Sequence, residues 1–202
     1  MIAVDLPSHG NSDTFSDLSL DLYVKVVESL IKELNLTNVI LAGHSLGGAI
    51  ALATFFKTPT KIDALILCAT GARLRVSPVI FEAIKNGDFL EYLPVGAFYR
   101  KTSREIIDPY IEHSKDITPE VVCMDYSICD SFDVMEKISS IHVPCLILCG
   151  HSDILTPVKY SQYFHDKIEK STLHIIKKAG HMVTLEKVEE TNRYIADFIE
   201  KI

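Results

Sequence analysis

The 202-residue sequence has no apolar run approaching 18 residues, so we expect no membrane span. Its first ten residues, MIAVDLPSHG, lack the basic region and the small-residue cleavage site of a signal peptide. Basic residues are not in excess either, because 20 Lys and Arg stand against 27 Asp and Glu, for a net charge of −7. We therefore expect neither a membrane nor nucleic acid as a partner.

Cysteine spacing suited to a disulfide framework is also absent. The five cysteines are odd in number and no two have CxxC spacing: Cys68, Cys123, Cys129, Cys145 and Cys149. Cys145 and Cys149 would lie about 13 Å apart along a strand, which is too far for a disulfide. We expect reduced, mostly buried thiols in a cytoplasmic protein.

Metal-ligand spacing is missing as well. The eight histidines form no cluster with one another or with carboxylates, so we expect no metal site and no cofactor.

What the sequence does have is an alternation of short apolar runs with segments of helical periodicity. Strands are predicted over 2–6, 38–43, 62–69, 143–150 and 171–179. Helices are predicted over 18–36, 46–57, 157–168 and 184–201. Continuously apolar strands separated by helices predict an α/β fold whose mostly parallel sheet is covered on both faces. The length fits one domain.

Residues 72–141 interrupt this alternation. Their apolar residues follow helical spacing, and prolines punctuate the stretch at positions 78, 94, 109 and 119. We interpret the stretch as a helical insertion between two strands of a core formed by 1–71 and 142–202. Its content of Val, Ile, Phe and Tyr suggests a mainly apolar substrate pocket.

A lone serine stands at a sharp strand-to-helix junction. Gly43-His44-Ser45-Leu46-Gly47 matches G-x-S-x-G after the strand 38–43 and before the helix 46–57, the context expected of a nucleophile elbow. Glycines leave room for so tight a turn, and the helix amino terminus favours developing negative charge. The alternative is an ordinary glycine-rich turn.

A serine hydroxyl needs a base, and the base needs an orienting carboxylate. Asp153 follows the strand 143–150, and His181 follows the strand 171–179. Both would lie at the sheet edge where Ser45 emerges, which is where open α/β sheets place their sites. The alternatives are that Asp153 merely caps the next helix and that His181 is a plain loop residue.

Other residues fit these roles less well. The strand 62–69 is followed by ATGARLR, which has no carboxylate that could replace Asp153. His44 is expected to point away from Ser45 across the elbow, and we interpret it and His151 as packing or surface residues.

These segments resemble the α/β-hydrolase fold family, specifically its capped bacterial-type serine hydrolases. The matching pieces are VDLPSHGNSD, LAGHSLGGAIAL, VPCLILCGHSDILTP and AGHMVTLEKVEETNRYIADFI. The resemblance implies Ser45 as nucleophile, His181 as base and Asp153 as orienting acid, with the Leu46 N–H as one oxyanion donor. It also implies that 72–141 is a cap over the substrate. Ser8 stands where the family's first motif usually has glycine.

The resemblance also implies about three strands before the first motif, and a loop from one of them that supplies the second oxyanion donor. The sequence begins after these elements, as in a fragment of a longer hydrolase. If the short form is instead complete, we hypothesise that residues 2–6 pair with 38–43 and that His9-Gly10 presents the missing donor.

The expected function is hydrolysis of a small ester or related acyl substrate through an acyl-enzyme on Ser45. Carbon–carbon cleavage, acyl transfer and peracid chemistry use the same triad in the family and stay open. The alternative is a catalytically impaired or silent scaffold that binds a small molecule or partner. A homodimer formed through the exposed sheet edge is a further expectation.

Overall fold

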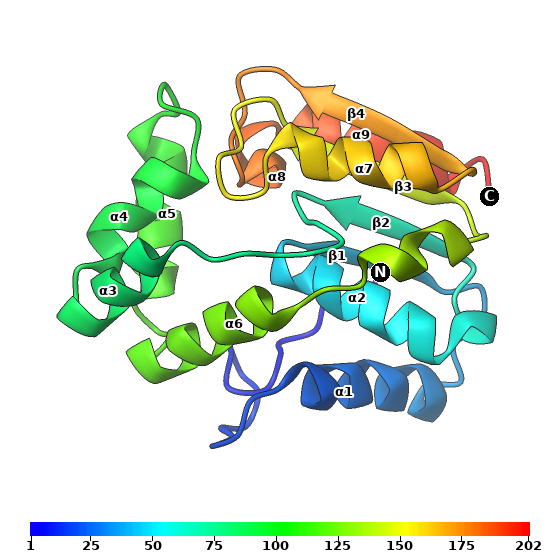
Figure 1. The fold of residues 1–202 in the computed structure, drawn as a ribbon, viewed down its shortest axis with the longest axis horizontal. Helices are drawn as coiled ribbons and strands as arrows, with labels where there is room; N and C mark the ends of the chain where they lie inside the picture. The colour runs from blue at the N-terminus through cyan, green and yellow to red at the C-terminus, as the bar shows by residue number, and fades with distance from the viewer.

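The computed structural model describes residues 1–202 and contains one four-stranded parallel sheet (Figure 1). Its strands occur in the order β1-β2-β3-β4, which is also their order along the chain. They are β1 (Ile40–His44), β2 (Ala64–Cys68), β3 (Cys145–Gly150) and β4 (Ser171–Ile176). The α/β fold class predicted from the alternating pattern is confirmed.

Helices connect the strands and cover both faces of the sheet. On one face, α2 (Leu46–Lys57) and α7 (Val158–Lys167) pack over alternate residues of β2 and β3, such as Leu65 and Ile147. On the other face, α9 (Val188–Ile199) packs over the intervening residues, such as Leu146. Helix α1 (Leu20–Glu33) lies against α2 rather than against the sheet (Figure 1).

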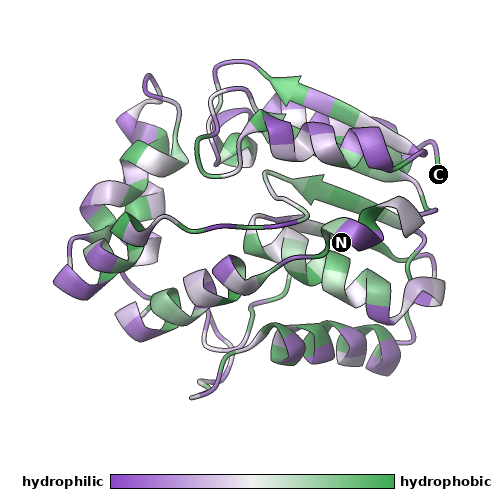
Figure 2. Cartoon of the chain, viewed as in Figure 1, coloured by the Kyte–Doolittle hydropathy of each residue, from purple (hydrophilic) through white to green (hydrophobic).

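The two central strands are apolar along their whole length because both of their faces are covered. Every residue of β2 and β3 is buried, and Figure 2 shows β2 as a continuous hydrophobic arrow. Strand β1 lies at the edge of the sheet, where Ala42 is exposed. No helix of the structure has both the length and the apolar composition needed to cross a bilayer.

The prediction of a strand over 2–6 is wrong, and so is the prediction that this strand pairs with 38–43. Residues 2–6 form no strand and no ladder with β1. The segment is hydrogen-bonded to the turn that directly follows it in the chain, and not to β1. The Asp5 carboxylate accepts the Asn11 N–H at 3.0 Å, and the Asp5 carbonyl accepts the Ser12 hydroxyl at 2.7 Å. An apolar pattern alone does not make a strand, and here the hydrogen bonds of Asp5 hold the segment against its own turn instead of along the open edge of β1.

Residues 72–141 are helical, as their spacing predicts. They contain α3 (Pro78–Asn86), α4 (Phe89–Ala97), α5 (Arg104–Ser114), α6 (Pro119–Ser131) and the 3₁₀-helix η2 (Met135–Ser140). Helices α3, α4 and α5 lie beyond the ends toward which the strand arrows point (Figure 1).

The two ends of this helical insertion run side by side. Leu74 N–H donates to the Phe132 carbonyl at 3.2 Å, and Val134 N–H donates to the Ala72 carbonyl at 2.7 Å. An isolated antiparallel bridge between Arg73 and Asp133 lies between these hydrogen bonds. The insertion therefore leaves and re-enters the core at one place.

The remaining short helices are η1 (Pro59–Lys61), between α2 and β2, and α8 (Val183–Glu186), just before α9. The closing helix predicted over 184–201 is thus divided in two at Lys187.

Leu67 in β2 tests how far stability depends on the covered strands. Its side chain is fully buried between the helical layers, so Leu67→Ala should lower the free energy of unfolding by about 2–5 kcal/mol. Val95→Ala is the control, because Val95 is 75% exposed, and it should change stability by less than about 0.5 kcal/mol. Urea denaturation measures both, and equal effects would contradict the assignment of the core.

Candidate active site

Ser45 sits between β1 and α2 in a backbone conformation that non-glycine residues rarely adopt, with φ 51° and ψ −116°. Its N–H donates to the Cys68 carbonyl at 3.0 Å, and its carbonyl accepts the Thr70 hydroxyl at 2.7 Å. The last residue of β2 and the loop that follows it therefore hold the strained residue from both sides.

Close approach of the main chain or of a side chain requires glycine at 43 and 48, but not at 47. A Cβ on Gly43 would overlap the Gly47 carbonyl, and one on Gly48 would overlap the Thr70 side chain. The local geometry is the tight strand-to-helix turn expected from G-x-S-x-G. Leu46 is the first residue of α2, so its N–H has no acceptor within the helix.

Asp153 follows β3 and is 5% exposed. One carboxylate oxygen accepts the N–H groups of Leu155 and Thr156, at 2.9 and 2.8 Å. The other accepts the Thr156 hydroxyl at 2.7 Å. Burial alone would raise the pKa of this carboxyl, but hydrogen bonds from His181 and Thr156 lower it below its ordinary value. Asp153 is therefore a fixed anion.

His181 meets this anion from the loop after β4. Its Nδ1 lies 3.0 Å from Asp153 Oδ2 and 3.2 Å from the Thr156 hydroxyl, and the residue is 5% exposed. Because a carboxylate only accepts, Nδ1 carries the proton and Nε2 is left with a free lone pair. No sequence pattern pointed to Thr156 beyond its place in the loop after Asp153.

Ser45 and His181 share the carboxyl edge of the sheet, but no hydrogen bond joins their side chains. The ring of His44 links the two regions. It lies 4.7 Å from the His181 ring, centroid to centroid, and its Nε2–H donates to the His181 carbonyl at 2.9 Å. The structure thus brings Asp153 and His181 into contact. Ser45 is not in contact with them through a hydrogen bond, but it directly follows His44, which is hydrogen-bonded to the His181 loop.

His44 therefore has a larger part in the site than the packing role expected from the sequence. Burial and the neighbouring His181 lower the pKa of His44 to about 4, so its ring is neutral at pH 7 and holds a single N–H. That N–H is directed at the loop that carries His181.

A pocket of about 200 Å³ opens beside Ser45 and Leu46. Most of its wall comes from the helical insertion and is apolar or aromatic: Phe89 and Leu93 from α4, Tyr110 from α5, and Val122 and Tyr126 from α6. Pockets that hold drug-sized ligands are typically ~300–1,000 Å³, so this one suits a small apolar group.

The same pocket has a polar corner that sequence analysis missed. His9 Nε2 lies 2.9 Å from Asp125, the other Asp125 oxygen accepts the Tyr23 hydroxyl at 2.6 Å, and His9 Nδ1 lies 3.0 Å from the Pro7 carbonyl. Both ring nitrogens face acceptors, and the hydrogen bond to Asp125 raises the pKa of His9. These three side chains join α6 of the insertion to the core.

Of the pair His9-Gly10, expected to present the second oxyanion donor, the His9 N–H is already used, and a donor role of Gly10 stays a prediction. The His9 N–H already donates to the Leu6 carbonyl at 2.8 Å. The His9 side chain borders the Ser45 pocket, while its main chain closes its own turn.

No group of three or more His, Cys, Asp or Glu side chains is arranged to hold a metal ion. All five cysteines are free, and only Cys123 is exposed.

His44→Gln tests the neutral histidine. A histidine whose pKa falls from 6.5 to about 4 on folding binds fewer protons in the folded state, so stability should fall as the pH drops from about 6.5 to about 4. In His44→Gln this part of the pH dependence should disappear, because glutamine donates without titrating. Urea denaturation at several pH values measures it, and exposed His151→Gln is the control. An unchanged pH dependence in His44→Gln would contradict the prediction.

Comparisons with known proteins agree with this architecture. The model of the alpha/beta hydrolase family matches residues 1–194. The pimeloyl-[acyl-carrier protein] methyl ester esterase of Neisseria meningitidis serogroup A is 26% identical over 218 aligned residues, covering 99% of this chain and 68% of the relative.

Two solved structures are similar over nearly the whole chain. A thermophilic esterase superimposes with a TM-score of 0.87 at 38% identity, covering 97% of this chain and 79% of the other. An esterase from Exiguobacterium antarcticum has a TM-score of 0.90 at 20% identity, covering 96% and 79%, and shows the fold alone. The family match, which spans nearly the entire sequence, together with the tight serine turn and the parallel sheet, places this chain in the alpha/beta hydrolase family.

Proposed function

We propose that this protein is a serine hydrolase that cleaves small, mainly apolar esters through an acyl-enzyme on Ser45. The observation that carries the proposal is the buried contact between His181 Nδ1 and Asp153 Oδ2, 3.0 Å long, at the sheet edge where the strained turn presents Ser45. A fixed anion, a histidine oriented by it and a serine on a sharp turn are the parts that acyl transfer requires.

In the proposed first half-reaction, Ser45 Oγ attacks the ester carbonyl carbon while His181 Nε2 takes the hydroxyl proton. Asp153 stabilises the resulting imidazolium without taking the proton itself. The Leu46 N–H donates to the negative oxygen of the tetrahedral intermediate, at the amino terminus of α2. The intermediate collapses, the C–O bond to the alcohol breaks, and the alcohol leaves with the proton from His181.

In the second half-reaction, His181 Nε2 takes a proton from water, whose oxygen attacks the acyl carbon. Collapse of this second intermediate returns the proton to Ser45 Oγ and releases the acid. The missing hydrogen bond between Ser45 and His181 is compatible with this cycle, because catalytic hydrogen bonds are often long before substrate binds.

The pocket supports a small substrate with an apolar portion. Its wall comes largely from the helical insertion, which we propose acts as a cap over the bound ester. The relatives point the same way, since one is a methyl ester esterase and the solved structure with 38% identity is an esterase. Cytoplasmic location remains part of this proposal.

A second candidate is a scaffold with little or no catalytic activity. It is favoured by the outer edge of β1, which pairs with no strand of the structure, while the donor assigned to the oxyanion is the one N–H of Leu46. Loss of one oxyanion donor costs roughly 10²–10³ in rate, so this reading predicts very slow turnover.

Labelling with a fluorophosphonate probe separates the two candidates. An active hydrolase should react covalently at Ser45 and turn over short p-nitrophenyl esters. Ser45→Ala and His181→Ala should each abolish labelling, and Asp153→Asn should lower kcat by about 10³–10⁴. Mass spectrometry locates the adduct.

Ser103→Ala is the matched control, because Ser103 is exposed and its side chain caps no helix. It should label and turn over like the wild type. A folded wild-type protein that never labels would refute the hydrolase and favour the scaffold. Labelling without turnover would point to the incomplete oxyanion site.

A further inference from the structure

Glu186, the last residue of α8, uses both carboxylate oxygens to bind two separate parts of the chain. Oε2 accepts the Gly180 N–H at 2.6 Å, directly before His181. Oε1 accepts the Tyr99 N–H at 2.8 Å and also the Thr102 hydroxyl. Tyr99 and Thr102 belong to the turn between α4 and α5 of the helical insertion.

The main chain of this turn is pressed against the loop that carries His181. A Cβ on Gly180 would lie 2.7 Å from Phe98 C and 2.7 Å from Tyr99 N, so only glycine fits there. On the other side of His181, the Met182 N–H donates to the Ala97 carbonyl at 2.9 Å. The residues before and after His181 are thus both bound to the insertion, one through Glu186 and one directly.

Glu186 has no role in the mechanism described above. It does not line the pocket beside Ser45, and it forms no hydrogen bond with the His181 ring. No lysine, arginine or histidine nitrogen lies within 4 Å of its carboxylate. Its three partners are uncharged donors, and hydrogen bonds from such donors to an ionised acceptor are stronger than neutral ones. This bonding fixes geometry rather than balancing charge.

We propose that Glu186 is a positioning residue that couples the α4–α5 turn to the His181 loop, so that the placement of the insertion sets the orientation of the base. This inference rests on the proposed function for the role of His181. The coupling matters for rate because a displacement of ~1 Å at a reacting group can cost about 10²-fold.

Thr102→Val tests the coupling from the insertion side. It removes one donor to Glu186 Oε1 and leaves every atom of the Glu186–Gly180 hydrogen bond in place. We expect amide hydrogen exchange at Gly180 to become faster, although Thr102 does not touch Gly180. We also expect kcat for a p-nitrophenyl ester to fall roughly fivefold, the rate equivalent of one ordinary hydrogen bond, with KM unchanged. Thr102→Ser keeps the hydroxyl and should restore both values.

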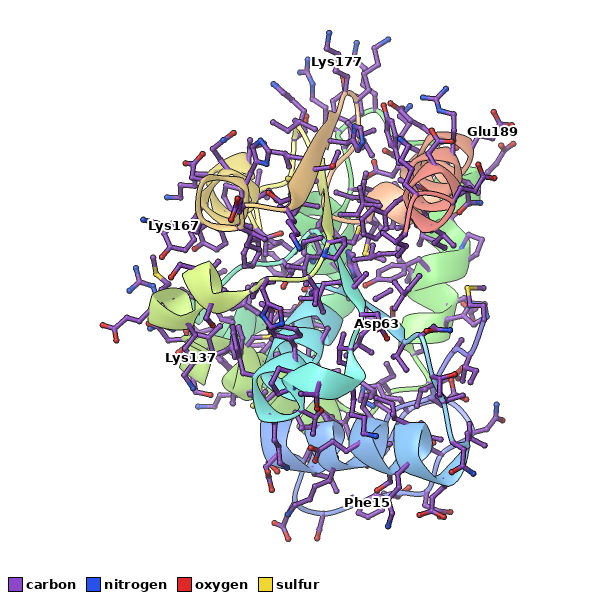
Figure 3. The ribbon with its side chains drawn as sticks, turned by 90° about the vertical axis from the view of Figure 1, so that its right-hand side faces the viewer. Phe15, Asp63, Lys137, Lys167, Lys177 and Glu189 are labelled. Carbon is purple, nitrogen blue, oxygen red and sulfur yellow. The ribbon has the colours of Figure 1, made fainter.

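Glu186→Gln removes one of the two anchors, because the amide keeps one acceptor oxygen while its nitrogen cannot accept the hydrogen bond that the replaced oxygen accepted. We expect kcat per fluorophosphonate-reactive serine to fall by about 10–100-fold, with little change in KM. Glu189→Gln is the matched control. This variant makes the same Glu-to-Gln change in the first turn of α9, where the exposed side chain of Glu189 points into solvent (Figure 3).

Unchanged Gly180 exchange in Thr102→Val would overturn the coupling. Faster exchange with an unchanged kcat in Glu186→Gln would overturn the positioning role and leave a purely structural contact. If the wild type neither labels nor hydrolyses esters, the proposed function fails, and the positioning role fails with it. The exchange at Gly180 would still decide the coupling between turn and loop.

Discussion

The parallel hydrogen-bonded ladder of β1 to β4 is the constraint on which the rest of the molecule depends. Because all four strands run the same way, the turns after them meet at one edge, although those turns come from widely separated parts of the sequence. The register Cys145↔Ser171 to Gly150↔Ile176 sets the loops of Asp153 and His181 side by side. The register Gly43↔Leu67 brings β2 against the serine turn.

Much of this arrangement was predictable from local pattern. Apolar runs of five or six residues identify covered strands, and Gly43 and Gly48 mark the turn because the main chain approaches too closely for a side chain. The contact between Asp153 and His181 follows from their places after adjacent strands. These predictions rest on periodicity and on sheet geometry, which a sequence carries directly.

The errors and omissions concern long-range partners. Residues 2–6 have the composition of a strand, but a strand exists only where a neighbour pairs with it, and composition does not show the neighbour. His9, Asp125 and Tyr23 are 14 to 116 residues apart, and no sequence motif predicts that their side chains are in contact. Glu186 looks like an ordinary surface residue in sequence because two of its partners are backbone N–H groups, which no residue type marks, and because Tyr99 and Thr102 are more than 80 residues away.

The adjacent ends of the helical insertion have a consequence for how such a protein can change. Ala72 and Val134 are joined by a hydrogen bond, so the chain between them closes on itself and contributes no strand to the sheet. Loop-closure entropy grows slowly with length, so segments of different size can be exchanged there at little cost to the core. If the proposed function holds, the residues that line the substrate pocket and the residues that do the chemistry lie in separable modules, provided that each replacement module still offers donors where Tyr99 and Thr102 now lie.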